Sequence, residues 1–152
     1  MNYWLMKSEP SVFSIDNLIR SPNKTTFWDG VRNYQVRNMI RDEMEKGDLA
    51  FFYHSNCKEP GIVGIIKIIS KGYPDSSAFK STHRYFDPKS NPNHPRWFGV
   101  DVKFVEKFSR IITLSELRSN AQLKDLLILR KGNRLSITPV SKKHWEQIKI
   151  FL

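Results

Sequence analysis

The chain has only one cysteine, Cys57, which excludes an internal disulfide and fits a reducing compartment. Long apolar runs are also missing, because no stretch approaches the roughly 18 residues that a membrane-spanning helix needs. The first residues, MNYWLMKSEP, lack the basic and then apolar segments of a secretion signal. We therefore expect a protein of the cytoplasm, nucleoid or nucleus, without a membrane partner.

Acidic residues are scarce relative to basic ones. The 152 residues include 15 Asp and Glu against 25 Lys and Arg, which gives a formal net charge of +10. A basic surface gains binding free energy because it releases counterions from phosphates. The charge therefore favours a nucleic-acid partner, although small proteins can also be basic merely for solubility.

The signature motifs of several enzyme classes are absent. The sequence has no GxGxxG, GxxxxGK[ST] or GxSxG, the patterns of dinucleotide sites, phosphate-binding loops and hydrolase nucleophiles. His54, His83, His94 and His144 show no metal-ligand spacing, so we expect no metal and no cofactor. Cys57 lies three residues after His54, a spacing that does not assure contact, and we interpret it as a small buried or turn cysteine.

Short strands and helices alternate irregularly along the chain. Alternating, β-branched or aromatic segments predict strands over 2–7, 48–56, 61–73, 97–108 and 134–140. Helical spacing predicts helices over 8–21, 29–47, 113–120, 123–129 and 141–152. We expect Asp29 as N-cap and Gly47 as stop of the second, a capping box of Thr113 and Glu116 at the start of the third, and Ser141 as cap of the last. Residues 74–96 have four prolines and no period, which indicates a long loop. The pattern predicts one α+β domain over 1–152 with a compact, barrel-like sheet.

Three short segments combine aromatic or strand-end positions with hydrogen-bonding side chains: KSEP (7–10), WDGVRNYQVR (28–37) and YHSNCKEPG (53–61). Trp28 offers a flat surface on which a base could stack, a contact that contributes about 1–3 kcal/mol. Glu9 could accept a hydrogen bond from an exocyclic amino group, as carboxylates do from cytosine N4. Ser8, Ser55 and Asn56 could complete the recognition of a base edge.

The helix predicted after Asp29 has a basic and aromatic flank. Tyr34, Arg37 and Arg41 fall away from the apolar stripe and suit phosphate contact and stacking. Each residue also has an ordinary structural interpretation, with Trp28 as a core tryptophan and Arg37 as a solvated charge.

Six motifs occur in order across nearly the whole chain: YWLMKSEP, TTFWDGVRNYQVRN, GDLAFFYHSN, PGIVGI, WFGVDVKFV and RLSITPV. This series resembles the EVE domain family. The resemblance implies the PUA-like fold, a curled mixed β-barrel with peripheral short helices. Domains of that fold bind RNA or read methylated bases in RNA or DNA. EVE domains are similar to readers that hold a modified base, above all a modified cytosine such as 5-methylcytosine, after it leaves the stack.

The resemblance also implies which residues meet the nucleic acid. The base-binding residues would be Lys7, Ser8, Glu9, Trp28, Asp29, Arg32, Asn33, Tyr34, His54, Ser55, Asn56, Arg134 and Ser136. We expect phosphate contacts from Arg37 and Arg41, and from Lys80 and Arg84 in the long loop. The sequence departs from the family pattern at Val36, where a smaller Ala is common, and this should affect packing alone.

The leading hypothesis is a monomeric, non-catalytic module that binds DNA or RNA with a modified base. One alternative is a general PUA-like RNA-binding domain that reads structure rather than a modification. Another is an enzyme acting on a nucleobase, with Glu9 or His54 as proton carrier and Lys7 beside Glu9. The last is a sensor of free nucleosides that uses the same pocket.

Overall fold

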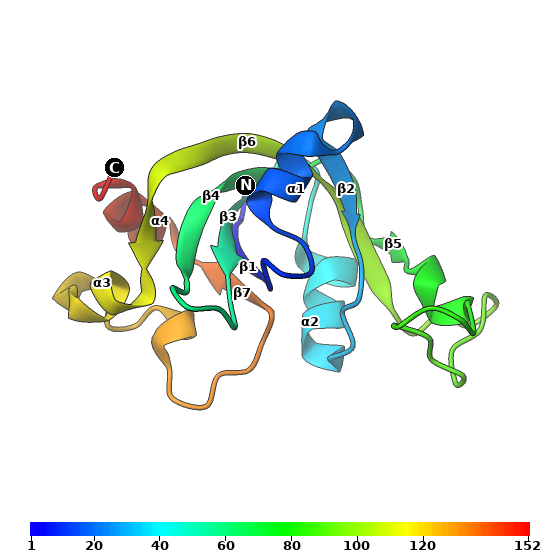
Figure 1. Cartoon of the computed structure of the whole chain (residues 1–152). Coiled ribbons are helices and arrows are strands. Elements are labelled where there is room, and N and C mark those ends of the chain that lie inside the picture. Colours follow the sequence, from blue (N-terminus) through cyan, green and yellow to red (C-terminus); the bar gives the residue numbers. More distant parts are fainter.

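One seven-stranded mixed sheet forms the centre of the structure, a computed structural model that describes all residues 1–152 (Figure 1). Its strands run in the order β2-β6-β4-β3-β1-β7, and β5 pairs with β6 beside this path. All pairs are antiparallel except β1 with β3. The strands are β1 (Tyr3–Ser8), β2 (Thr25–Trp28), β3 (Leu49–His54), β4 (Gly61–Ile68), β5 (Tyr73–Pro74), β6 (Phe98–Thr113) and β7 (Ile137–Val140).

The helices are short and lie around the sheet. The α-helices are α1 (Ile15–Arg20), α2 (Tyr34–Asn38), α3 (Leu114–Ser119) and α4 (Lys142–Lys149). A π-helical turn, η2 (Met39–Glu43), continues α2, and single 3₁₀ turns are η1 (Pro22–Lys24), η3 (Ser76–Phe79), η4 (Ala121–Leu123) and η5 (Leu127–Leu129). No helix has the length and apolar character needed to cross a membrane. The α+β class and the mixed sheet are confirmed, and the sheet is open between β2 and β7.

Side-chain caps decide where the helices begin. The predicted capping box of Thr113 and Glu116 is present at α3, and Ser141 caps α4 as expected. The predicted start of the second helix at Asp29 is wrong. Residues 29–33 lie outside any helix, and the helix begins after Asn33, whose Oδ1 accepts from the Val36 N–H at 3.0 Å.

The long strand β6 curves across the sheet and pairs with β2, β4 and β5 (Figure 1). It extends to Thr113, five residues beyond the predicted end at 108. The register between β4 and β6 shifts twice, and such bulges bend a strand and increase its twist. One end of β6 pairs with β2 and β5, and its other end leads into α3.

Hydrophobic side chains pack on both faces of the sheet. Alternate residues of β3 enter different clusters, with Ala50 and Phe52 in one and Phe51 and Tyr53 in the other. The first cluster includes buried residues of α1 and α2, and the second those of α3 and α4. Both faces of the sheet are therefore covered by apolar side chains. Polar side chains that could bind a ligand lie at the ends of the strands.

Candidate nucleic-acid interface

The parallel pairing of β1 and β3 brings their carboxyl ends together. Ser8 lies opposite His54 in the register, and the Ser55 N–H donates to the Ser8 carbonyl at 3.0 Å. On the other side of β1, the Lys7 N–H donates to the Ser136 carbonyl at 2.8 Å. Three segments far apart in the sequence thus meet at one edge of the sheet.

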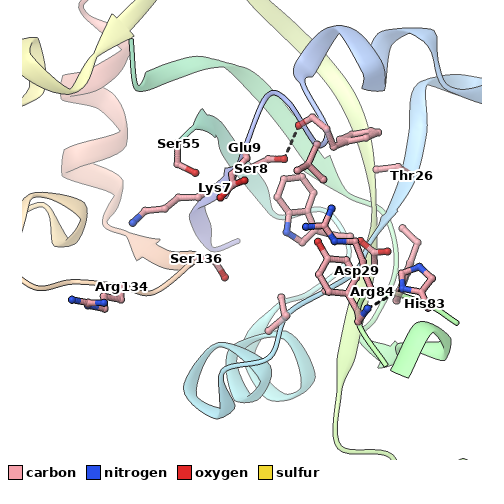
Figure 2. Close-up of a pocket in the computed structure, with 17 residues that line it drawn as sticks. Lys7, Ser8, Glu9, Thr26, Asp29, Ser55, His83, Arg84, Arg134 and Ser136 are labelled. Atoms are coloured by element: carbon pink, nitrogen blue, oxygen red, sulfur yellow. Dashed lines mark hydrogen bonds between the residues drawn. The ribbon is translucent and has the colours of Figure 1, made fainter. Parts of the chain in front are cut away.

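A cavity of about 620 Å³ opens at this edge (Figure 2). This volume lies within the range of about 300–1,000 Å³ that is typical of small-molecule sites. Its walls come from the turn after β1, from β2 and the residues that follow it, and from the 83–85 segment, with smaller parts from the ends of β3 and before β7. The lining residues are Lys7, Ser8, Glu9, Val12, Phe13, Thr26, Phe27, Trp28, Asp29, Gly30, Val31, Ser55, His83, Arg84, Tyr85, Arg134 and Ser136.

Trp28 belongs both to the core and to the cavity wall. Its side chain is only 8% exposed and meets Phe52 edge-on, with ring centroids 5.5 Å apart. It also lines the cavity, at the end of β2. The sequence left open whether Trp28 packs or stacks, and the structure shows it packed in the core with part of its surface at the cavity.

Carboxylate and hydroxyl groups form one side of the rim. The Asn56 Nδ2 donates to Glu9 Oε1 at 3.1 Å, which holds the carboxylate beside the opening. Ser8 Oγ donates to the Phe13 carbonyl at 2.6 Å and so fixes the turn after β1. Glu9 itself is exposed and can accept a further hydrogen bond.

Two cations, Lys7 and Arg134, lie on the same side of the cavity as Ser8 and Glu9. Figure 2 shows Lys7 and Arg134 on the same side of the cavity, across from His83 and Arg84. Neither Lys7 nor Arg134 takes part in any of the four ion pairs of the structure. Partial burial lowers the pKa of the Lys7 amine, because a charged amine loses hydration there.

Asp29 adds a second carboxyl group to the lining. Partial burial raises the pKa of Asp29, and the negative charge of Asp75 raises it further. The positive charges of His83 and Arg32 act in the opposite direction. The cavity therefore offers two carboxyl groups, Glu9 on one wall and Asp29 on the other.

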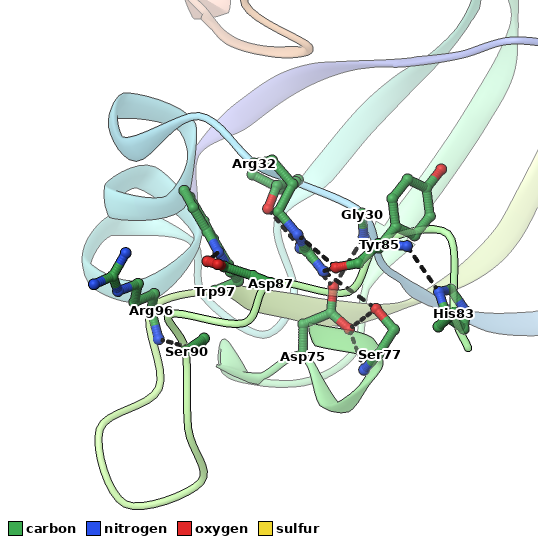
Figure 3. A network of polar contacts seen from close by, with 11 residues as sticks. Gly30, Arg32, Asp75, Ser77, His83, Tyr85, Asp87, Ser90, Arg96 and Trp97 are labelled. Atoms are coloured by element: carbon green, nitrogen blue, oxygen red, sulfur yellow. Dashed lines mark hydrogen bonds and ion pairs between the residues drawn. The ribbon is translucent and has the colours of Figure 1, made fainter. Parts of the chain in front are cut away.

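The 83–85 wall is held in place by Arg32 (Figure 3). Its guanidinium donates to the Tyr85 carbonyl from Nη2 at 2.6 Å and from Nε at 3.1 Å, and Nη1 lies 3.1 Å from Asp75 Oδ2. Asp75 is 1% exposed and accepts also from the Gly30 N–H and from Ser77. Burial acts to raise the pKa of Asp75, but these hydrogen bonds together with the one from Arg32 hold it below its usual value.

Gly30 allows Tyr85 to reach the cavity. Its φ of +80° lies in the left-handed region, and a Cβ at this position would lie 2.5 Å from the Tyr85 ring. Only a residue without a side chain lets the ring approach the backbone so closely.

The structure brings eight of the thirteen predicted base-binding residues to the cavity: Lys7, Ser8, Glu9, Trp28, Asp29, Ser55, Arg134 and Ser136. Five others do not line it. Arg32 points to the 75–85 segment, Asn33 caps α2, and Asn56 reaches the rim through Glu9 alone. Tyr34 stacks on Trp97, and His54 Nε2 accepts from the Ile15 N–H at 3.2 Å.

Of the four predicted phosphate contacts, only Arg84 lines the cavity. Arg37 lies on α2, where its Nη1 donates to the Arg96 carbonyl at 2.8 Å. Arg41 forms an exposed ion pair with Asp42, and Lys80 is exposed in the long loop.

Sequence reasoning missed several lining residues, above all Phe13, Thr26, His83 and Tyr85. The length of the loop over 74–96 was a signal of function, but its irregular sequence did not show which side chains turn inward. No three His, Cys, Asp or Glu side chains gather in a way that could hold a metal ion.

Comparison with known proteins identifies the family. The profile of the EVE domain matches residues 2–149. The chain belongs to the EVE domain family. Human thymocyte nuclear protein 1 is similar to this EVE domain, with 44% identity in an alignment of 162 positions that covers 95% of this chain and 71% of the human protein.

Solved structures agree with this assignment. A protein from Pseudomonas syringae is 45% identical and superposes with a TM-score of 0.93 over 98% of both chains. Human THYN1, in a crystal structure in complex with DNA that contains 5-methylcytosine, is 42% identical with a TM-score of 0.93, over 99% of this chain and 97% of that one. The family resemblance inferred from the six motifs is confirmed.

Proposed function

We propose that this EVE domain binds nucleic acid and holds a flipped, modified cytosine in the cavity without altering it. The observation that carries the proposal is the cavity itself. It is lined by the indole of Trp28 and the carboxylate of Glu9, and the basic side chains Lys7, Arg84 and Arg134 also line it. The likeness to human THYN1, crystallised with DNA that contains 5-methylcytosine, supports the same ligand class.

The energetics suit base extrusion. Taking a base out of a duplex costs a few kcal/mol, and stacking on an aromatic side chain returns about 1–3 kcal/mol. A carboxylate such as Glu9 can accept a hydrogen bond from the cytosine N4 amino group. Burial of one methyl group adds about 0.8 kcal/mol, so we expect about fourfold tighter binding of a 5-methylcytosine strand than of the plain strand.

The position of His54 favours binding over catalysis. A proton carrier must reach the base, but His54 is absent from the cavity lining and its Nε2 already accepts a backbone hydrogen bond. Mass analysis of modified oligonucleotides after incubation with the protein tests this point, and we expect unchanged masses. A mass change that depends on the protein would replace the binding proposal with an enzyme.

The central experiment is a titration at fixed salt concentration. It uses matched DNA and RNA oligonucleotides, each with cytosine or 5-methylcytosine at one position. We expect tighter binding of the modified strand in at least one polymer. Equal curves for modified and plain strands in both polymers would contradict the modified-base proposal and favour a general RNA-binding or DNA-binding domain.

Two tryptophan variants separate binding from folding. Trp28→Phe reduces the indole wall, and we expect it to weaken binding of the modified strand. Trp145→Phe is the matched control, because Trp145 is also buried but belongs to the second cluster, away from the cavity. Equal effects of the two variants on binding would remove Trp28 from the proposed site.

We also propose that the domain acts as a monomer in the cytoplasm, nucleoid or nucleus. The +10 charge and the single free cysteine support contact with nucleic acid in a reducing compartment. Light scattering of the protein alone and with a bound oligonucleotide measures the oligomeric state, and a dimeric mass would contradict the monomer.

A further inference from the structure

Guanidinium groups and aromatic rings form a continuous stack from the cavity to the exposed face of α2. Figure 3 shows its middle part, in which Arg32 lies between Trp97 and Tyr85. Successive groups are 4.8 to 5.6 Å apart along the whole series. In order from the cavity, the stack consists of Arg84, Tyr85, Arg32, Trp97, Tyr34 and Arg37.

The middle of the stack serves the fold. Arg32 pairs with Asp75, and Trp97 is 6% exposed with its Nε1 donating to Asp87 at 2.6 Å. These groups have partners within the protein and little surface to offer a ligand. They hold the 75–97 segment against α2 at a fixed distance from the cavity.

The outer end of the stack is open to solvent. Tyr34 is 50% exposed although its ring stacks on Trp97 at 4.8 Å. The Arg37 guanidinium lies 4.9 Å from the Tyr34 ring centroid and bonds only to neutral oxygens, those of Asn38 and Arg96. Arg37 is in none of the ion pairs, and Asp42, the carboxylate on which its charge acts, is already paired with Arg41.

We propose that Tyr34 and Arg37 form a second contact surface, which binds the nucleic-acid strand that flanks the base held in the cavity. The proposal rests on the function proposed above. A guanidinium without an ion-pair partner of its own suits a backbone phosphate, and the exposed tyrosine ring suits the sugar or base beside it. Successive nucleotides of a duplex strand rise by about 3.4 Å, so the three steps from Tyr85 to Tyr34 correspond to only a few nucleotides.

This surface contributes affinity without selectivity. Phosphate and sugar contacts position the strand but carry no information about the modified base. The cavity and the Tyr34–Arg37 surface therefore have separable roles, and variants at each should change different quantities.

The test measures binding of a dodecamer duplex, with cytosine or 5-methylcytosine at its centre, to Tyr34→Ala and Arg37→Ala. We expect each variant to bind both duplexes roughly fivefold or more weakly, while the ratio between the two duplexes stays that of the wild type. For Arg37→Ala, the slope of log affinity against log salt should fall by about one. Affinity for free 5-methyldeoxycytidine, where it is measurable, should not change.

Two controls accompany these variants. Tyr34→Phe keeps the ring and should bind as the wild type does. Arg118→Ala removes an exposed arginine of α3, at the opposite end of the sheet from the 75–97 segment, and should also leave affinity nearly unchanged (Figure 1). Thermal unfolding of each variant confirms that the fold is retained.

Wild-type affinity of both Tyr34→Ala and Arg37→Ala for the dodecamers would overturn the proposal. A change in the ratio between the two duplexes would also overturn it, because the surface would then take part in base selection. If the wild type shows no preference for 5-methylcytosine but both variants still weaken binding, the modified-base function fails while the second contact surface stands.

Discussion

Asn56 and Glu9 are joined by a hydrogen bond of 3.1 Å between Nδ2 and Oε1, although 47 positions separate them in the sequence. The bond links the turn after β1 to the turn after β3, and the parallel register of these strands makes it possible. Asn56 adopts a φ of +49°, a conformation that Asn tolerates better than most residues. Backbone and side chain of Asn56 thus both serve the position of the Glu9 carboxylate.

Asn56→Gly should weaken binding of the modified strand and cost at most about 1 kcal/mol of stability, because the hydrogen bond that is lost is exposed. Gly can adopt the positive φ, but it removes the side chain that donates to Glu9. We expect the less well positioned Glu9 to reduce the binding free energy by about 1 kcal/mol, or roughly fivefold in affinity. Asn23→Gly is the matched control, since Asn23 has a φ of 55° and is exposed outside the cavity lining. Titration and urea unfolding measure both variants, and similar affinity losses for the two would contradict the role of Asn56.

Gly30→Ala should cost more stability than Gly132→Ala. Both glycines have nearly the same positive φ, +80° and +79°, so both variants carry a backbone cost of about 1 kcal/mol. Only at Gly30 does the new Cβ meet the Tyr85 ring, whereas nothing lies within 4 Å at Gly132. The displaced ring should add about 1–3 kcal/mol to the loss. Equal free energies of unfolding in urea would show that Tyr85 moves aside without cost.

Arg32→Lys should loosen the 75–87 segment. A lysine cannot reproduce the two hydrogen bonds to the Tyr85 carbonyl together with the contact to buried Asp75, so we expect a loss of about 1–3 kcal/mol. Hydrogen exchange should accelerate over 76–87. Arg110→Lys alters an exposed ion pair in which Nη1 alone donates to both carboxylate oxygens of Glu116, and it should change stability by less than about 1 kcal/mol. Unchanged exchange over 76–87 in Arg32→Lys would refute the anchoring role.

His54 should make the fold sensitive to mild acid. Burial lowers the pKa of His54 in the folded state, so the unfolded chain takes up this proton at a higher pH than the folded chain does. The free energy of unfolding therefore falls as the pH drops from about 6.5 toward the folded-state pKa. Protonation of Nε2 also removes the acceptor of the Ile15 N–H.

His54→Gln should flatten this dependence, because Gln accepts a hydrogen bond and does not titrate. Urea unfolding between about pH 7 and pH 5 measures it, with His144→Gln as the control on α4. If His54→Gln and the wild type lose stability in parallel over this range, His54 is not the group responsible.

Sequence patterns predicted the structural features that depend on neighbouring residues alone, namely helix caps and the alternation of side chains along a strand. Ser141 and the pair of Thr113 and Glu116 cap helices as their spacing indicates. The alternation over 97–108, which predicted a strand, places Val100 and Val102 of β6 in the core. The four residues of β2 were missed, since so short a strand has little pattern and exists through its pairing with β6.

The site was predictable where it lies on strand ends and not where it depends on distant partners. Lys7, Ser8, Glu9 and Ser55 line the cavity because β1 and β3 pair side by side. Arg32 was expected to face the base, but it turns to Asp75, 43 positions away, and no sequence pattern links the two. Tyr85 was missed for the same reason, because Arg32 and Gly30 determine its place.

Different contacts support the two halves of the cavity, the half formed by strands and the half formed by residues 83–85. The sequence of the second half can therefore be replaced more easily than that of the first. The half on β1, β2 and β3 cannot change without disturbing the sheet, whereas the 83–85 half depends chiefly on Arg32 and the tight contact at Gly30. A graft of a different segment over 79–86, with Arg32, Asp75, Gly30 and Asp87 retained, can therefore present new side chains to a ligand while the sheet stays unaltered. The same division offers a route by which domains of this architecture can diversify in what they recognise.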